Sequence, residues 1–323
     1  MTDFLSLDGL CERLLAAERS IILSHTRPDG DTVGAAAALG HLLRALGKEP
    51  AWDCADPCPR RLAFLLEGDL FLPASENEGG TVIAVDIASP HQLGALADRY
   101  AGKIAFSIDH HAACSPFAPT YLCADAAAAG EIVYEIGARL LERGALPLLP
   151  HGFVNAAYAA ISSDTGCFRY ANVTPRTHEV AAALLAAGAD ADRINHLLFE
   201  CRTEGELRAG AIAAENLSLH AGGRIGVVSL SLASRAGLAD EDFETAIDVA
   251  RSVAGVEIAA AIRELTGGVC RVSLRSTGAD VSAVAASLGG GGHVRAAGCT
   301  VTGDVSEALA TLLPLLEGAL TRA

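Results

Sequence analysis

Short, mostly apolar runs alternate with longer segments of helical periodicity over the first part of the chain. The apolar runs, which predict buried strands, occupy residues 20–24, 81–85 and 103–108. Hydrophobic side chains recur at helical spacing in 6–18, 32–46, 126–143, 150–162 and 176–187. Strands that alternate with helices are typical of a parallel sheet with helices on both faces. We therefore predict an α/β domain over residues 1–200.

A second, smaller pattern follows. Residues 204–220 have the spacing of one long helix, which Gly222-Gly223 interrupts, so we predict a linker helix over 201–222. Beyond it we predict strands at 224–230, 256–263 and 269–275, helices near 240–251, 281–287 and 305–319, and a glycine loop at 289–292. The last part of the chain is therefore expected to form a smaller α/β domain over residues 223–323.

Polar side chains gather where the predicted strands of the first domain end. They are His25, Asp29 and Asp31 after the first strand, Asp86 at the end of the second, and Asp109, His110 and His111 at the end of the third. In sheets of this kind the ligand crevice lies beyond the carboxyl ends of the strands. We therefore expect these side chains to converge on one site.

Together with Asp164 in "SSDTG", these clusters bring five carboxylates and three histidines to the predicted crevice. Carboxylates repel one another unless a positive charge lies between them. Oxygen ligands mixed with imidazole suit Mn²⁺, Mg²⁺ or Fe²⁺ better than a structural zinc. Two such ions about 3.5–4 Å apart lower the pKa of a water and polarise a phosphoryl oxygen. Each cluster alone is usual in a turn, a helix cap or a solvated loop, and it is their joint placement that favours a metal site.

Composition and charge narrow the choice of partner. The chain has 323 residues and a formal net charge of −15, which opposes binding of long nucleic acid, because such binding relies on many lysine and arginine contacts to phosphates. The nine cysteines show no framework spacing and are expected to be reduced thiols of a cytoplasmic protein. We see no signal peptide and no apolar run of membrane-spanning length.

Four motifs in fixed order carry a family resemblance. The stretches "SHTRPDGDTVG", "VIAVDIA", "IDHH" and "SSDTG" resemble the motifs of the DHH phosphoesterase superfamily. The later stretch "SLGGGGHVRAAG" is similar to the DHHA1 domain. Length and layout are closest to the short RecJ-like branch, which includes nanoRNases that also act as pAp phosphatases, and related dinucleotide phosphodiesterases. The resemblance covers essentially the whole chain.

The resemblance implies a role for each matching residue of the first domain. One metal ion would be held by His25, Asp29 and Asp86, and the other by Asp31, Asp86, His110 and Asp164, with Asp86 as the bridge. His111 would face the substrate phosphate, and Asp109 would orient the two histidines. The implied cofactor is a pair of divalent ions, Mn²⁺ with Mg²⁺ as the alternative, and the implied catalytic residues are His111, Asp86 and Asp109.

The same resemblance implies a phosphate contact in the second domain. Residues Gly290, Gly291 and Gly292 would let backbone N–H groups approach a phosphate, since glycine has no Cβ to obstruct them. Substrate would also meet the side chains of His293, Arg295, Arg275 and Ser276. The alternative interpretation of the glycine run is a flexible loop. One departure from the family pattern is His91-Gln92 in "SPHQLG", where relatives often carry an arginine.

These features predict a metal-dependent phosphoesterase. Its expected substrates are short oligoribonucleotides, cut to mononucleotides, and pAp, cut to AMP, with linear or cyclic dinucleotides as further candidates. Attack by a hydroxide that two metal ions activate would be the chemical step. The alternatives are an inorganic pyrophosphatase like those of family II and a nucleotide-sensing module without catalysis. The resemblance also implies a homodimer, with no membrane partner.

Overall fold

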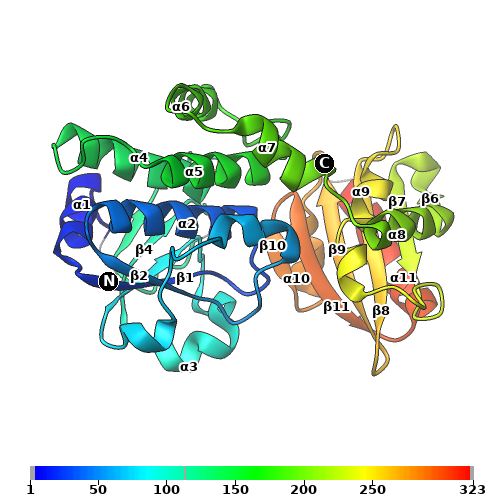
Figure 1. The fold of residues 1–323 in the computed structure, drawn as a ribbon. Helices are drawn as coiled ribbons and strands as arrows, with labels where there is room; N and C mark the ends of the chain where they lie inside the picture. The colour runs from blue at the N-terminus through cyan, green and yellow to red at the C-terminus, as the bar shows by residue number, and fades with distance from the viewer. Residues whose placement is uncertain (1–3, 113, 321–323) are drawn as a thin grey trace. The chain divides into compact units, whose positions relative to one another are not determined.

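The computed structural model describes residues 4–112 and 114–320, and the chain divides into two compact units, Met1–Cys201 and Arg202–Ala323 (Figure 1). Each unit has its own sheet and its own hydrophobic core. Among the described residues, none of the helices combines the length and the apolar character that crossing a membrane requires.

The first unit is built on a parallel five-stranded sheet in the order β2-β1-β3-β4-β5. Its strands are β1 (Arg19–Leu23), β2 (Glu49–Asp53), β3 (Thr81–Val85), β4 (Ile104–Asp109) and β5 (Thr120–Leu122). Because all strands run in the same direction, their carboxyl ends lie at one edge of the sheet. The predicted parallel sheet is thus confirmed, whereas β2 and β5 were not expected from their short and partly polar sequences.

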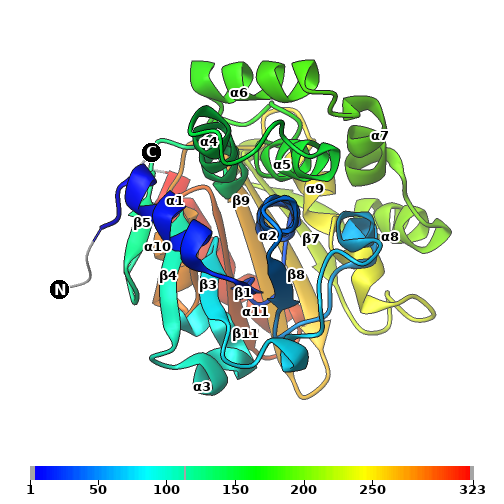
Figure 2. The ribbon, with the colours of Figure 1, turned by 60° about the vertical axis from the view of Figure 1, so that its left-hand side comes forward.

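Long helices cover one face of this sheet (Figure 2). They are α1 (Leu7–Ala16), α2 (Gly30–Ala45), α4 (Ala129–Glu142), α5 (His151–Asp164) and α6 (Pro175–Ala186), followed by the short α7 (Ala191–Asn195) and a π-helical turn at His196–Glu200. Close approach of α2, α4 and α5 depends on small residues. Gly34 and Gly130 both face Ala160, and a Cβ at either would press against it.

The opposite face of the sheet is covered by shorter segments. These are the 3₁₀ turns Ala74–Asn77 and Pro90–Leu96 and the four-residue α3 (Ala97–Tyr100). They pack on the outward side chains of β1 and β3, among them the buried Ile21 and Val82. Both faces are therefore covered as predicted, with the long helices on one side. A further 3₁₀ turn, Arg60–Leu66, packs on the helical side.

The second unit contains a mixed six-stranded sheet in the order β10-β11-β9-β8-β7-β6. Its strands are β6 (Leu217–His220), β7 (Ile225–Leu230), β8 (Ile258–Leu265), β9 (Val269–Ser276), β10 (Gly291–His293) and β11 (Ala296–Thr302). Its helices are α8 (Glu204–Glu215), α9 (Ala246–Arg251), α10 (Val281–Ser287) and α11 (Val305–Leu320), with 3₁₀ turns at Ala221–Gly223 and Asp240–Phe243. Helices α8 and α9 pack on one face of the sheet, and α10 and α11 on the other, so the smaller α/β unit is confirmed.

Two expectations for the second unit are wrong in detail. The helix expected over 204–220 ends at Glu215, and residues 217–220 pair antiparallel with β7 instead. This pairing is a long-range contact that helical periodicity does not register. The expected glycine loop is in part a strand, because Gly291–His293 pairs with β11 in a hairpin. A Cβ at Gly290 or Gly292 would overlap the backbone of β11, so these two glycines permit the close pairing.

Candidate metal centre

The predicted ligands come from five segments that meet at the carboxyl edge of the first sheet. They are His25, just after β1, Asp29 and Asp31 at the start of α2, Asp86 after β3, His110 after β4, and Asp164 at the end of α5. Their nitrogen and oxygen atoms fall into three overlapping sets, namely His25 with Asp29 and Asp86, Asp31 with His110 and Asp164, and Asp86 and His110 with the neighbouring His111. Within each set the atoms lie within 4.8 Å of one another. The structure thus brings all six predicted ligands together.

The first group joins His25, Asp29 and Asp86. The Nε2 atom of His25 lies 3.7 Å from Oδ1 of Asp29 and 3.6 Å from Oδ2 of Asp86. Its other ring nitrogen, Nδ1, lies 2.8 Å from the carbonyl oxygen of Thr26, which fixes the orientation of the ring. Asp29 also caps α2, because its Oδ1 accepts the backbone N–H groups of Asp31 and Thr32.

The second group consists of His110 and the three aspartates that surround it, Asp31, Asp86 and Asp164. The Nε2 atom of His110 lies 3.4 Å from Oδ1 of Asp86, 3.6 Å from Oδ2 of Asp31 and 3.9 Å from Oδ2 of Asp164. Its Nδ1 atom lies 3.2 Å from the carbonyl oxygen of Ala126. In both groups, therefore, Nδ1 is bonded to a backbone carbonyl and Nε2 faces the carboxylates, which is the arrangement of a metal-binding histidine.

Asp86 lies between the two groups. One of its carboxylate oxygens faces His25 and the other faces His110, although the side chain is only 3% exposed. Its Oδ1 atom is buried without a hydrogen-bond partner among the described residues. Asp86 also has a φ of 60°, in the left-handed region that costs energy for a residue with a Cβ. A buried, unsatisfied carboxylate held in a strained backbone fits a residue that bridges two cations.

The surrounding charges shift the pKa values of these groups. Burial alone would lower the pKa of His25 and of His110, but the neighbouring carboxylates outweigh it and raise each pKa to about 11. Burial and the charge of Asp86 raise the pKa of Asp31 well above its usual range. Burial and nearby aspartates raise the pKa of Asp164 to about 7. Asp31 and Asp164 therefore hold protons more tightly than ordinary aspartates do, whereas, despite burial, the neighbouring histidines lower the pKa of Asp29 and of Asp86.

This crowding predicts proton release when metal binds. At pH 8 the metal-free protein keeps His25 and His110 protonated, because their raised pKa values of about 11 lie above that pH. The interaction of the two protonated histidines with the neighbouring carboxylates stabilises the folded metal-free protein. This stabilisation is complete below the unfolded-state histidine pKa of about 6.5 and is lost as the pH rises through about 11. A metal-binding imidazole must be neutral. Saturation of the metal-free protein with Mn²⁺ at pH 8 is expected to release at least about two protons per chain, measured with a pH indicator in weak buffer. Binding without proton release would contradict this charge assignment.

Asp109 and His111 form a pair beside the second group. The Nδ1 atom of His111 lies 2.7 Å from Oδ1 of Asp109, which is fully buried. The same oxygen accepts the backbone N–H groups of His110 and His111. Asp109 therefore fixes both the ring of His111 and the backbone that carries the two histidines. His111 Nδ1 also lies 3.5 Å from Asp86 Oδ1, which places His111 at the edge of the cluster.

The first turn of α4 binds the side chain of Asp31, a contact that the sequence did not lead us to expect. Both carboxylate oxygens of Asp31 accept backbone N–H groups, at 2.7 Å from Ala129 and 2.9 Å from Gly130. The side chain of Asp31 is 1% exposed, so these two bonds and its cluster neighbours determine its position. Ala129 and Gly130 contribute through the backbone, and no side-chain motif marks them.

Within His91-Gln92, the dipeptide that departs from the family pattern, Gln92 has a structural role. The side-chain oxygen Oε1 of Gln92 accepts the backbone N–H groups of Ala88 and Ser89. The backbone carbonyl oxygen of Gln92 accepts the N–H of Thr26, at 2.7 Å. Gln92 therefore holds together the turn after Asp86 and the loop that carries His25.

The predicted substrate-binding residues of the second unit lie near one hairpin. Arg275 on β9 is opposite Ala296 on β11, and the N–H of Ser276 donates to the carbonyl oxygen of Arg295. The three predicted glycines lead into β10 or form part of it, and His293 ends this strand, its side chain lying outside the described part of the structure. Gly291 differs from its neighbours because a Cβ there would meet open space.

Comparison with known proteins places this architecture in a family. A model of the N-terminal domain of the DHH family matches residues 19–161, and a model of the DHHA1 domain matches residues 222–321. A bifunctional oligoribonuclease and PAP phosphatase NrnA from Thermus thermophilus is 34% identical, over 97% of this chain and 94% of that protein. The chain belongs to the DHH family. The resemblance inferred from the four motifs is thereby confirmed.

Two further proteins are similar to this DHH-family chain over most of its length. A bifunctional oligoribonuclease and PAP phosphatase NrnA from Bacillus subtilis is 25% identical, over 90% of this chain and 91% of that protein. An exopolyphosphatase-related protein from Bacteroides fragilis is 22% identical in sequence. Its crystal structure superposes on this chain with a TM-score of 0.87, over 97% of this chain and 95% of that one. The structural match confirms the fold along nearly the whole chain.

Proposed function

We propose that this DHH-family protein is a metal-dependent phosphoesterase that cuts short oligoribonucleotides to mononucleotides and pAp to AMP. The observation that carries the proposal is the position of Asp86, with one buried oxygen toward each of two histidine and aspartate groups. Its NrnA relatives from two bacteria are named oligoribonucleases and PAP phosphatases, which supports the same substrates here. Linear or cyclic dinucleotides fall within the same substrate class.

The residues of the site divide into those that hold cations and those that meet substrate. His25, Asp29 and Asp86 would hold one divalent cation, and Asp31, Asp86, His110 and Asp164 the other, as the short distances between their ligand atoms support. When bound, two such ions supply an activated water and neutralise charge on the phosphoryl oxygens. We favour Mn²⁺ over Mg²⁺ because imidazole nitrogens accompany the oxygens in both groups.

His111 is the side chain that we assign to the substrate phosphate. Burial would lower its pKa, but the hydrogen bond to Asp109 and the charge of Asp86 outweigh it and raise the pKa. A protonated ring keeps its Nδ1–H on Asp109 and donates from Nε2 to a phosphate oxygen. Donation to the more negative oxygens of the transition state stabilises that state more than the bound substrate.

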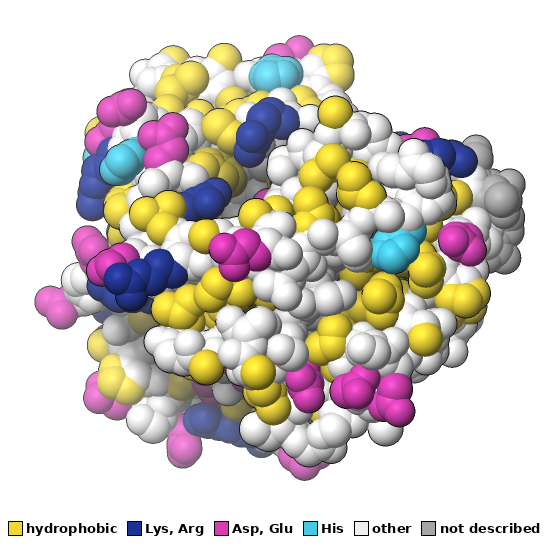
Figure 3. Space-filling view, turned by 90° about the vertical axis from the view of Figure 1, so that its right-hand side faces the viewer, with side chains coloured by type: hydrophobic (Ala, Val, Ile, Leu, Met, Phe, Trp, Pro, Cys, Tyr) yellow, Lys and Arg dark blue, Asp and Glu magenta, His cyan; other side chains and the backbone are white. Residues whose placement is uncertain are grey.

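The substrate range also follows from charge. The chain has 39 acidic side chains and 24 lysines and arginines. On the face drawn in Figure 3, the blue lysine and arginine side chains lie in separate places among acidic and apolar ones. A surface of this kind favours small substrates held at one site over a long strand held along its backbone. By family resemblance we also propose a cytoplasmic homodimer.

A product assay tests this proposal against its alternatives. Purified protein with Mn²⁺ would be given pAp, a linear dinucleotide, a cyclic dinucleotide and pyrophosphate in separate reactions. We expect AMP and phosphate from pAp, and mononucleotides from the linear dinucleotide. Turnover of pyrophosphate alone would support the pyrophosphatase instead. Binding of nucleotides without any turnover would support a sensing module.

The glycine motif offers a second test, because its glycines differ in their surroundings. If the N–H of Gly291 contacts substrate phosphate, a Cβ there should hinder that approach while the hairpin stays intact. Gly291→Ala is expected to raise KM for pAp about tenfold with unchanged thermal stability, since a hydrogen bond to a charged group contributes about 1.5–3 kcal/mol. Gly290→Ala, whose Cβ would overlap the backbone of β11, is the control for hairpin disruption and should lower the melting temperature. Unchanged KM in Gly291→Ala would make the glycine run purely structural.

A further inference from the structure

The start of α4 and the residues just before it hold two side chains of the second group. This support segment, residues 126–130, offers the carbonyl oxygen of Ala126 to Nδ1 of His110, at 3.2 Å. Its last two backbone N–H groups donate to the two carboxylate oxygens of Asp31. Any shift of the support segment therefore moves His110 and Asp31 together.

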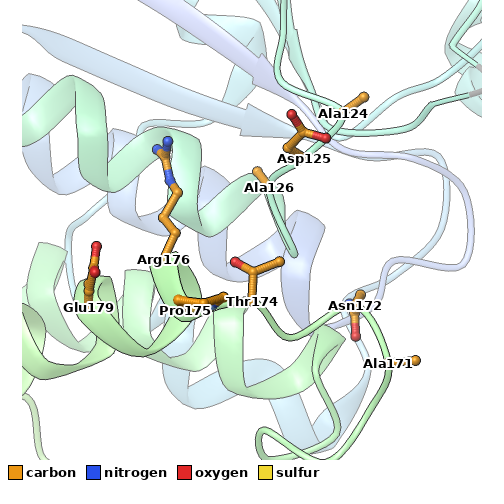
Figure 4. A pocket seen from close by; sticks show the side chains of 9 residues that line it. All are labelled: Ala124, Asp125, Ala126, Ala171, Asn172, Thr174, Pro175, Arg176 and Glu179. Carbon is orange, nitrogen blue, oxygen red and sulfur yellow. The ribbon is translucent and has the colours of Figure 1, made fainter.

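Asn172 ties the support segment to the third member of the group. Its Nδ2 atom donates to the carbonyl oxygen of Ala127, at 3.0 Å, and to the carbonyl oxygen of Asp164, at 3.1 Å. One side-chain amide thus links the segment that holds Asp31 and His110 to the end of α5 that carries Asp164. In Figure 4, Asn172 lies on the loop before α6, at the edge of a pocket that Asp125 and Ala126 also line.

An ion pair between the buried Glu131 and the partly exposed Arg176 links the start of α6 to the start of α4. Glu131, in the first turn of α4, is fully buried, and its Oε2 lies 3.6 Å from Nε of Arg176 at the start of α6. Arg176 also pairs with Glu135 one turn further along α4. Neither oxygen of Glu131 has a hydrogen-bond partner among the described residues, so Arg176 is the neighbour that offsets its charge. This pair keeps the loop of Asn172 close to the support segment.

We propose that Asn172 is a positioning residue for the second metal site. By joining the support segment to Asp164, it sets the separation of Asp164 from Asp31 and His110, and so the affinity of this site for its ion. The inference rests on the proposed function, because it takes the second group to be a metal site. Asn172 touches neither metal nor substrate in this scheme and acts through the backbone of its neighbours.

Metal titration of the metal-free protein tests the inference. Mn²⁺ bound to wild type, Asn172→Ala and Asn172→Asp would be counted by equilibrium dialysis or by the EPR signal of free Mn²⁺. Wild type should bind two ions. Both variants should bind one ion as wild type does and the other about tenfold more weakly, at the lower end of the effect of groups that support metal ligands. Excess Mn²⁺ should restore most of the activity.

Asn155→Ala provides a matched control. Asn155 lies near the opposite end of α5, and its amide also makes two contacts, with the N–H of Asp190 and with Nδ1 of His151. Its loss should leave both Mn²⁺ affinities unchanged, so that a general loosening of α5 is separated from the effect of Asn172. Equal weakening of both ions in the Asn172 variants, or no weakening, would overturn the inference.

Asp31→Asn separates failure of the inference from failure of the proposed function. If Asp31→Asn removes one ion while the Asn172 variants bind both ions normally, the inference alone is wrong. If wild type binds fewer than two ions, or Asp31→Asn leaves the number unchanged, the proposed metal centre fails and the inference fails with it.

Discussion

Asp86→Asn is expected to lower kcat/KM for pAp and for a dinucleotide by at least about a thousandfold, or ~4 kcal/mol in activation free energy. The substitution removes the negative charge that faces both His25 and His110, and so weakens both proposed cations together. Bound Mn²⁺ should fall from two ions toward none, in parallel with the activity. Kinetics on both substrates and metal content measured on the same preparation provide the check.

Asp190→Asn is the control for this prediction. Asp190 caps α7 outside the cluster, and asparagine is an equally good cap, so the variant loses the same charge with its local structure retained. It should keep both ions and near wild-type rates. Wild-type turnover in Asp86→Asn, or loss of activity with both ions still bound, would rule out Asp86 as the bridge.

Substrate length is expected to produce the second large effect. At low salt, kcat/KM for a strand of about thirty nucleotides should be at least about a hundredfold below that for a dinucleotide. A net charge of −15 repels a polyanion, and affinity for long strands depends on many lysine and arginine contacts to phosphates. Chromatography of the products from equal concentrations of strand ends provides the measurement. The prediction fails if the long strand and the dinucleotide are degraded at the same rate.

The convergence of the proposed metal ligands could be predicted, because three of them directly follow a predicted strand. The apolar runs before His25, Asp86 and His110 mark strands, and the carboxyl ends of parallel strands meet at one edge of a sheet. Asp164 ends a helix, and its place in the group required the family motif in addition. The strand pattern thus predicts that these polar side chains lie at the carboxyl edge of the sheet, without any knowledge of the distances between them.

The supports of the cluster could not be predicted in this way. Asn172 and Glu131 act through contacts with residues distant in sequence, and neither lies in a motif that the family resemblance supplied. The strand β6 was missed for a related reason, since its pairing with β7 overrides a local pattern that favours helix. In the glycine run, the sequence indicated an unusual backbone, but only the partner strand β11 shows that Gly290 and Gly292 serve the hairpin.

Activity followed during Mn²⁺ titration of the metal-free protein tests the two-metal phosphoesterase most directly. Hydrolysis of a dinucleotide and the number of bound ions would be measured in the same samples. We expect hydrolysis to level off when two Mn²⁺ ions are bound per chain, and to be absent from the metal-free protein. Full activity with one ion bound, or no hydrolysis with two ions bound, would contradict the proposed function.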